Sequence, residues 1–266
     1  MSVYPRAIKA NFVFSLFLGF ARDVLGITEK NIAFAASICS DDINSIELPL
    51  TKMIGPFVLG GLDGFPFVGQ TGIEAFSHHV PDEGMAFIFF GPHVGVGDGG
   101  EVGTIKRPGM ASRTACCGSA SAALEHVIAG SDPCYDPELD FQQKAIFDIL
   151  KAHAPELKLL AMPARFVRAT ELIYDASHDR MRELLKHLDL QGKMAVVAGG
   201  TLINEDDAKG SLISLNSLST YGFKSFGRFD GSKAEGTVNL MSDFKHYAKN
   251  ELLNVLAAIE PVSDRG

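Results

Sequence analysis

Cysteine and histidine side chains follow two of the most apolar segments of this chain. Cys39 ends the run IAFAASIC, and His93 stands just after the run MAFIFFG. A third position comes from the adjacent Cys116 and Cys117, where small residues open the next predicted helix. Two thiolates and one imidazole suit zinc, whose catalytic sites take three protein ligands and leave a fourth position for water. Water bound there ionises near neutral pH and provides a hydroxide nucleophile.

The same residues also have structural interpretations. A cysteine at a strand end is commonly a small buried hydrophobe, and a histidine after an apolar strand is often a hydrogen-bonded structural residue. The sequence Cys-Cys-Gly could equally be a tight helix start. Because the three positions are far apart in the sequence, their spacing does not choose between a metal site and these interpretations.

The predicted elements would bring these residues together. The two apolar runs show no alternation of polar and apolar residues, which is typical of strands covered on both faces. Strands that alternate with helices indicate an α/β fold with a mainly parallel sheet covered by helices on both faces. In such sheets the functional crevice lies outside the carboxyl ends of the strands, where Cys39 and His93 are expected. We expect helices at 7–25, 43–53, 72–79, 118–129, 138–153, 169–187 and 241–258, and further strands at 157–161 and 193–204.

Two glycine-rich stretches separate these elements. The first, residues 55–72, has phenylalanines between its glycines and is predicted to be a close-packed loop instead of a linker. The second, GVGDGGEVGTIKRPG, begins just after His93 and is predicted to be a hairpin with its turn at 98–100. This hairpin would return the chain to Cys116 and Cys117.

The composition indicates a globular protein with one domain, residues 1–266. Hydrophobic residues make up 46% of the chain, and its net charge is −8, which argues against nucleic acid or an anionic membrane as a partner. The apolar run at 11–21 is too short to span a bilayer and is expected to be a buried first helix. Four cysteines, two of them adjacent, make no disulfide framework. We therefore expect a soluble protein of a reducing compartment, in the cytoplasm or in an organelle such as a plastid.

Five motifs, in the same order along nearly the whole chain, carry a family resemblance. They resemble the limiting-CO2-inducible protein B family, also called theta-class carbonic anhydrases, which are similar in fold to beta-class carbonic anhydrases. The resemblance implies a homodimer with its active site near the subunit interface. The motifs are CSDDIN at 39–44, TGIEAFSHHVPDEG at 71–84, FFGPHVGVGDGGEVGTIKRPG at 89–109, CCGSASAALE at 116–125 and GGTLIN at 199–204.

The resemblance also implies a ligand set and a reaction. The ligands of a zinc ion would be Cys39, His93 and Cys117, with Cys117 preferred to Cys116 because it is followed by glycine. The implied activity is the reversible hydration of CO2 to bicarbonate by a zinc-bound hydroxide. One alternative needs the same ligands: a non-catalytic, zinc-stabilised protein that binds a partner or senses inorganic carbon. A second alternative, a zinc hydrolase of another small substrate, lacks an evident general base.

Asp41, two residues after the first ligand, would have one of two roles in such a site. Paired with an arginine, it would stay ionised, leave the metal open and accept a hydrogen bond from the nucleophile. Released from the arginine, it would occupy the fourth coordination position and shut the enzyme off. The beta class has that arginine four residues after its first cysteine, where this chain has Ile43, so Arg107 is our candidate. A structural alternative is that Asp41 caps a turn.

His78 and His79 are the main rivals for the metal. They lie at the predicted end of a helix, before Val80 and Pro81, so we interpret His78 as structural or as a neighbour of the ligands. Phenylalanines could form an apolar pocket for CO2, although core packing explains them equally well. The phenylalanines concerned are Phe65, Phe67, Phe89 and Phe90.

Overall fold

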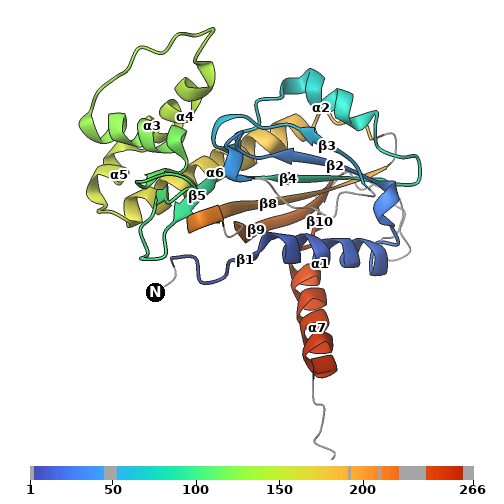
Figure 1. Ribbon diagram of the computed structural model, residues 1–266. Coiled ribbons are helices and arrows are strands. Elements are labelled where there is room, and N and C mark those ends of the chain that lie inside the picture. The colour runs from blue at the N-terminus through green and yellow to red at the C-terminus, as the bar shows by residue number, and fades with distance from the viewer. Residues whose placement is uncertain (1–2, 45–52, 191–192, 209–210, 222–237, 260–266) are drawn as a thin grey trace, which may run out of the picture.

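The centre of the fold is a mixed sheet whose neighbouring strands follow the order β1-β9-β8-β4-β2-β3 (Figure 1). The computed structural model describes residues 3–44, 53–190, 193–208, 211–221 and 238–259. Two more strands lie beside this row, because β10 pairs with β9 and β5 pairs with β8. The strands are β1 (Ile8–Lys9), β2 (Ile32–Ser37), β3 (Ile54–Val58), β4 (Met85–Phe90), β5 (His93–Val96), β8 (Met194–Glu205), β9 (Ser211–Tyr221) and β10 (Val238–Asn239).

Parallel pairing of the central strands sets the position of the site. Strand β4 runs parallel to β2 on one side and to β8 on the other. Ser37 lies opposite Phe90, so β2 and β4 end at the same level of the sheet. The chain segments that follow these two ends carry Cys39 and His93, and they therefore meet at one edge of the sheet.

Helices cover both faces of the sheet (Figure 1). On one face lie α1 (Ala10–Asp23) and α7 (Met241–Ile259), and on the other α2 (Gly69–Ser77) and α6 (Ala164–Leu185). Phe17 of α1 stacks on Phe87 of β4 with ring centroids 3.7 Å apart, and on the opposite face Phe90 stacks on Tyr174 of α6. The central strands are buried on both faces, which explains their continuous apolar sequence. The predicted α/β fold is confirmed.

A second group of helices packs beside the carboxyl ends of the strands. It comprises α3 (Gly118–Ala129), α4 (Phe141–Ala152) and α5 (Ala154–Leu159), which form an apolar cluster with the start of α6. Cys39, Cys117 and Val94 belong to the same cluster. The edge of the sheet that carries the candidate ligands is therefore closed over by helices.

Several predictions of elements were wrong. Residues 157–161, predicted as a strand, lie mostly in the short helix α5, which begins after His153 with Pro155 in its first turn. Strand β3 lies in the glycine-rich stretch that was predicted to be a loop. It is an edge strand of the sheet, where a glycine and a proline, here Gly55 and Pro56, interrupt few interstrand hydrogen bonds. Strand β9 was not predicted, because it mixes serine and asparagine with its apolar residues.

The predicted helix at 43–53 is a single 3-10 turn, Asp42–Asn44, as far as the structure describes it, and residues 45–52 lie outside the described residues. Within the described ranges, no helix is long and apolar enough to cross a membrane.

Candidate metal centre

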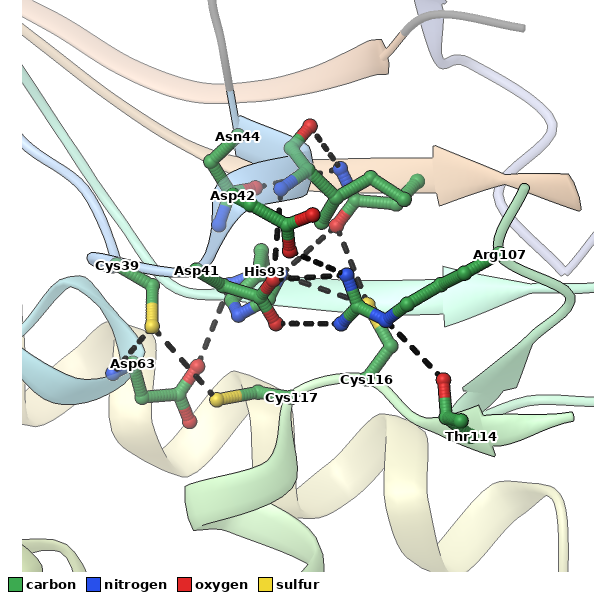
Figure 2. A network of polar contacts seen from close by, with 12 residues as sticks. Cys39, Asp41, Asp42, Asn44, Asp63, His93, Arg107, Thr114, Cys116 and Cys117 are labelled. Atoms are coloured by element: carbon green, nitrogen blue, oxygen red, sulfur yellow. Dashed lines mark hydrogen bonds and ion pairs between the residues drawn. The ribbon is translucent and has the colours of Figure 1, made fainter. Parts of the chain in front are cut away.

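Cys39, His93 and Cys117 meet in the interior of the protein (Figure 2). One donor atom from each of the three lies within 4.8 Å of the other two, and the two sulfur atoms are 3.9 Å apart. A tetrahedral zinc ion with Zn–S bonds of about 2.3 Å requires a sulfur separation of about 3.8 Å. The side chains are buried, with exposed fractions of 6%, 0% and 2%. The donor set and its spacing therefore fit zinc.

The ring of His93 is oriented so that one nitrogen remains available to a metal. Its Nδ1 lies 2.8 Å from Oδ1 of Asn204, at the end of β8. The Asn204 amide nitrogen donates to Asn44 and Ser211, so the amide oxygen faces His93 and accepts the Nδ1 proton. Nε2, which is buried, has no hydrogen-bond partner among the described residues. A histidine held in this way presents the Nε2 lone pair to a metal.

The structure separates the roles of Cys116 and Cys117. The sulfur of Cys117 faces Cys39, whereas that of Cys116 lies 3.6 Å from His93 Nδ1 and 3.4 Å from Asn204 Oδ1. Asp41, His93 and Cys116 form a second cluster with donor atoms within 4.8 Å of one another. Nδ1, the ring nitrogen nearest Cys116, is already bound to Asn204, so the cluster with Cys117 is the better ligand set.

Hydrogen bonds prepare the Cys39 sulfur to bind a cation. Contact with the Cys117 thiol and with the His93 ring lowers the pKa of Cys39 to about 4, against the opposing effect of burial. The backbone N–H of Asp63 also points at this sulfur, at 3.2 Å. The contact between the two cysteines raises the pKa of Cys117, so in the metal-free protein Cys39 is the thiolate of the pair, and the thiolate is the form of cysteine that binds zinc.

Asp41 and Arg107 form a bidentate ion pair next to the three candidate ligands (Figure 2). The guanidinium donates to both carboxylate oxygens at 2.9 and 2.8 Å, and it also contacts Asp42 and Thr114. Burial raises the pKa of Asp41, but the bonds from Arg107, together with contacts to Asp42, His93 and the Ile43 backbone, lower it to about 2. The ion pair predicted between Asp41 and Arg107 is thus present, and the arginine comes from a loop that is distant in the sequence.

That loop is the glycine-rich excursion between His93 and Cys117. The hairpin predicted around 98–100 is present as a single antiparallel bridge between Val96 and Val102. A second hairpin follows it, in which β6 (Thr104–Ile105) pairs with β7 (Thr114–Ala115). Asp206, just after β8, anchors the excursion by accepting backbone N–H bonds from Asp98 and Lys106 and a salt bridge from Arg113. These contacts hold the excursion against the end of β8, and the chain then continues to Cys117.

Asp63 is a residue of the cluster that the sequence reasoning missed. It is 1% exposed, its Oδ1 accepts the His93 backbone N–H at 3.4 Å, and its Oδ2 has no partner among the described residues. Burial raises the pKa of Asp63 to about 7. The available signal was that Asp63 is the only acidic residue of the glycine-rich stretch 55–72. Asn204 was also missed, although it ends the motif GGTLIN.

Glycines allow the loop of Asp63 to enter the site. Gly64 adopts a φ of 72°, and a Cβ atom there would strike the carbonyl oxygen of Gly91. Asp63 itself has a φ of 52°, in the left-handed region that aspartate and asparagine tolerate better than most residues. The hydroxyl of Ser37 donates to the Gly64 carbonyl and holds the loop against the end of β2.

The other candidates lie elsewhere. His78 and His79 are exposed at the end of α2 and belong to neither of the donor clusters found among the described residues. Phe89 and Phe90 are core residues, each 1% exposed. Phe65 and Phe67 are half-buried and follow Asp63 in its loop. The centroids of their rings are 5.0 Å apart.

Known proteins match both the sequence and the fold. A family model described as limiting CO2-inducible proteins B/C beta carbonic anhydrases matches residues 17–222. The crystal structure of PtLCIB4, described as a homolog of the limiting CO2-inducible protein LCIB, is 27% identical, with a TM-score of 0.72, and the match covers 89% of this chain and 95% of that one. The crystal structure of LCIB is 18% identical with a TM-score of 0.57, covers 82% of this chain and 91% of that one, and shows the fold alone. No curated protein matches the chain.

Proposed function

Because the chain belongs to the limiting CO2-inducible protein B/C family of beta carbonic anhydrases, we propose that it catalyses the reversible hydration of CO2 to bicarbonate. One zinc ion would be held by Cys39, His93 and Cys117. The observation that carries this proposal is the separation of the two sulfur atoms together with a buried, unpartnered Nε2 of His93. Both features are what a tetrahedral zinc site requires.

The chain's own residues have distinct tasks in this reaction. Zinc, when bound, supplies Lewis acidity that makes water a nucleophile near neutral pH. Asn204 holds His93 in the tautomer that leaves Nε2 free. Asp41 is kept ionised by Arg107, so it can accept a hydrogen bond from the attacking water while staying away from the metal. A proton must then leave toward solvent, and the exposed Asp42 carboxylate beside Arg107 lies on that side of the site.

The burial of the site favours a second candidate function. All three proposed ligands are less than a tenth exposed, and a closed, buried zinc site is typical of structural metal. The protein would then be a zinc-stabilised member of the family without hydratase activity, acting through a partner or as a sensor of inorganic carbon.

A stopped-flow CO2 hydration assay on protein of measured zinc content separates the two candidates. We expect about one zinc per chain and hydration well above the rate in buffer. The double variant Cys39→Ser, Cys117→Ser should lose both zinc and activity. Zinc at one per chain without hydration would support the second candidate, and undiminished zinc in the double variant would overturn the ligand assignment.

We further propose that the protein acts as a homodimer, as the family resemblance implies. Large apolar side chains are exposed around the start of α4, where Leu139, two residues before the helix, is 87% exposed and Phe141, its first residue, is 50% exposed. Phe141 contacts Phe67, in the loop that carries Asp63, so this surface adjoins the proposed site. Sedimentation analysis should show a dimer that Leu139→Asp weakens, and a monomeric wild-type protein would refute the proposal.

A further inference from the structure

Asp63 contacts all three proposed metal ligands, yet no role in the reaction outlined above requires it. Its backbone N–H donates to Cys39 and its Oδ1 accepts from the backbone of His93. Its carboxyl group lies beside the Cys117 sulfur (Figure 2). We propose that Asp63 is a positioning residue of the metal site, and that its carboxylate raises the affinity of the three ligands for a dication.

The fold by itself does not require a carboxylate at this position. The φ of 52° is as accessible to asparagine as to aspartate. The two backbone contacts need an N–H and one side-chain oxygen, and an asparagine would supply both. What asparagine lacks is the negative charge.

In the absence of a cation that charge is a cost to the folded state. Asp63 is 1% exposed, it lies against two cysteine sulfurs, and Oδ2 has no partner among the residues described. A buried, incompletely paired carboxylate destabilises a protein. The guanidinium of Arg107, in the same polar network, is already bound to Asp41 and Asp42. A dication at the three ligands would reverse the sign of the interaction, because the carboxylate would then stabilise a positive charge.

The variant Asp63→Asn tests this inference, which rests on the proposed metal site. Zinc affinity, measured by competition with a colorimetric chelator at pH 8, should fall by about 10- to 100-fold, the usual loss when a partner of a ligand is removed. The cobalt-substituted variant should keep its thiolate-to-cobalt absorption band, because both cysteines still bind. Thermal unfolding of the metal-free variant should occur at the wild-type temperature or above it.

Asp206→Asn is the matched control for a buried carboxylate. Asp206 is 5% exposed, but its oxygens are paired with Arg113 and two backbone N–H groups, so its replacement should lower the unfolding temperature of the metal-free protein. An equal loss of metal-free stability in Asp63→Asn, or its failure to fold, would show that Asp63 is structural and overturn the inference. Unchanged zinc affinity in Asp63→Asn would also overturn it.

The wild-type protein distinguishes this inference from the proposed function. If it binds zinc but does not hydrate CO2, the proposed activity fails while the role of Asp63 is still decided by the variant's affinity. If it binds neither zinc nor cobalt, both proposals are overturned.

Discussion

Removal of the Arg107 side chain should abolish the proposed CO2 hydration without releasing the proposed zinc. In Arg107→Ala, Asp41 loses two hydrogen bonds, of 2.9 and 2.8 Å, and the only side-chain cation with which it forms an ion pair in the described structure. A free carboxylate beside a zinc ion tends to coordinate it, because nothing then holds it in the outer shell. We therefore expect CO2 hydration to fall at least about tenfold, while zinc content stays at the wild-type value.

The structure also sets the expected loss of stability. Burial raises the pKa of Asp41, and Arg107 is the largest of the groups that bring it below its usual 3.8, to about 2. After allowing for solvent screening of this partly exposed pair, the interaction is worth roughly 1 to 2 kcal/mol. For a chain of this size that corresponds to about 2 to 8 °C in the unfolding temperature, measured on metal-free protein near pH 7.

Cobalt substitution shows whether Asp41 closes the site. The Arg107→Ala protein should have a changed visible spectrum, because a carboxylate oxygen enters the coordination sphere, and the double variant Arg107→Ala, Asp41→Asn should recover the wild-type spectrum. Arg168→Ala removes a partly exposed salt bridge to Glu156, outside the polar network of the site, and serves as the control, with no expected effect on spectrum or activity. Full hydration activity in Arg107→Ala would refute this reasoning.

Three further predictions concern single side chains. His93→Ala should lose zinc in metal analysis, whereas His78→Ala should keep it, because only His93 lies in the cluster; the reverse result would make His78 the ligand. Asn204→Leu should weaken zinc binding about 10- to 100-fold in chelator competition, and Asn204→Asp should largely retain it, since an acceptor for His93 Nδ1 remains; equal affinities in the two variants would show that this acceptor is irrelevant. Because the pKa of Asp41 is lower in the folded than in the unfolded protein, the unfolded chain binds its proton first as the pH falls. The stability contributed by the pair is thus present above about pH 4 and lost toward pH 2. The free energies of unfolding of metal-free wild type and Arg107→Ala should therefore converge as the pH falls through that range. A difference between them that stays constant with pH would contradict the pairing.

The sequence was sufficient for the fold class and for the family. Continuous apolar strands such as Met85–Phe90 can only be covered on both faces, so the layered architecture follows from local composition. The same strands indicated where Cys39 and His93 come together, because the carboxyl ends of parallel neighbours lie at one edge of a sheet. Arg107 could be named as a partner for Asp41 because this chain has Ile43 where the beta class has an arginine. The structure places the side chains of Asp41 and Arg107 in contact.

Other features of the site depended on contacts between distant parts of the chain. Asn204 binds His93 across 111 positions, and Asp63 reaches Cys39 and His93 through a glycine-lined loop whose path no local pattern indicates. Which of two adjacent cysteines faces Cys39 is likewise a question of side-chain direction, which the hairpin and its anchor at Asp206 decide. The sequence by itself thus determined the layers and the types of ligand, because these follow from local periodicity and chemistry. Only the tertiary structure identified the residues that orient the candidate ligands and place a carboxylate beside them. Hydrogen bonds between segments that are distant in the sequence produce no periodic pattern from which they could be predicted.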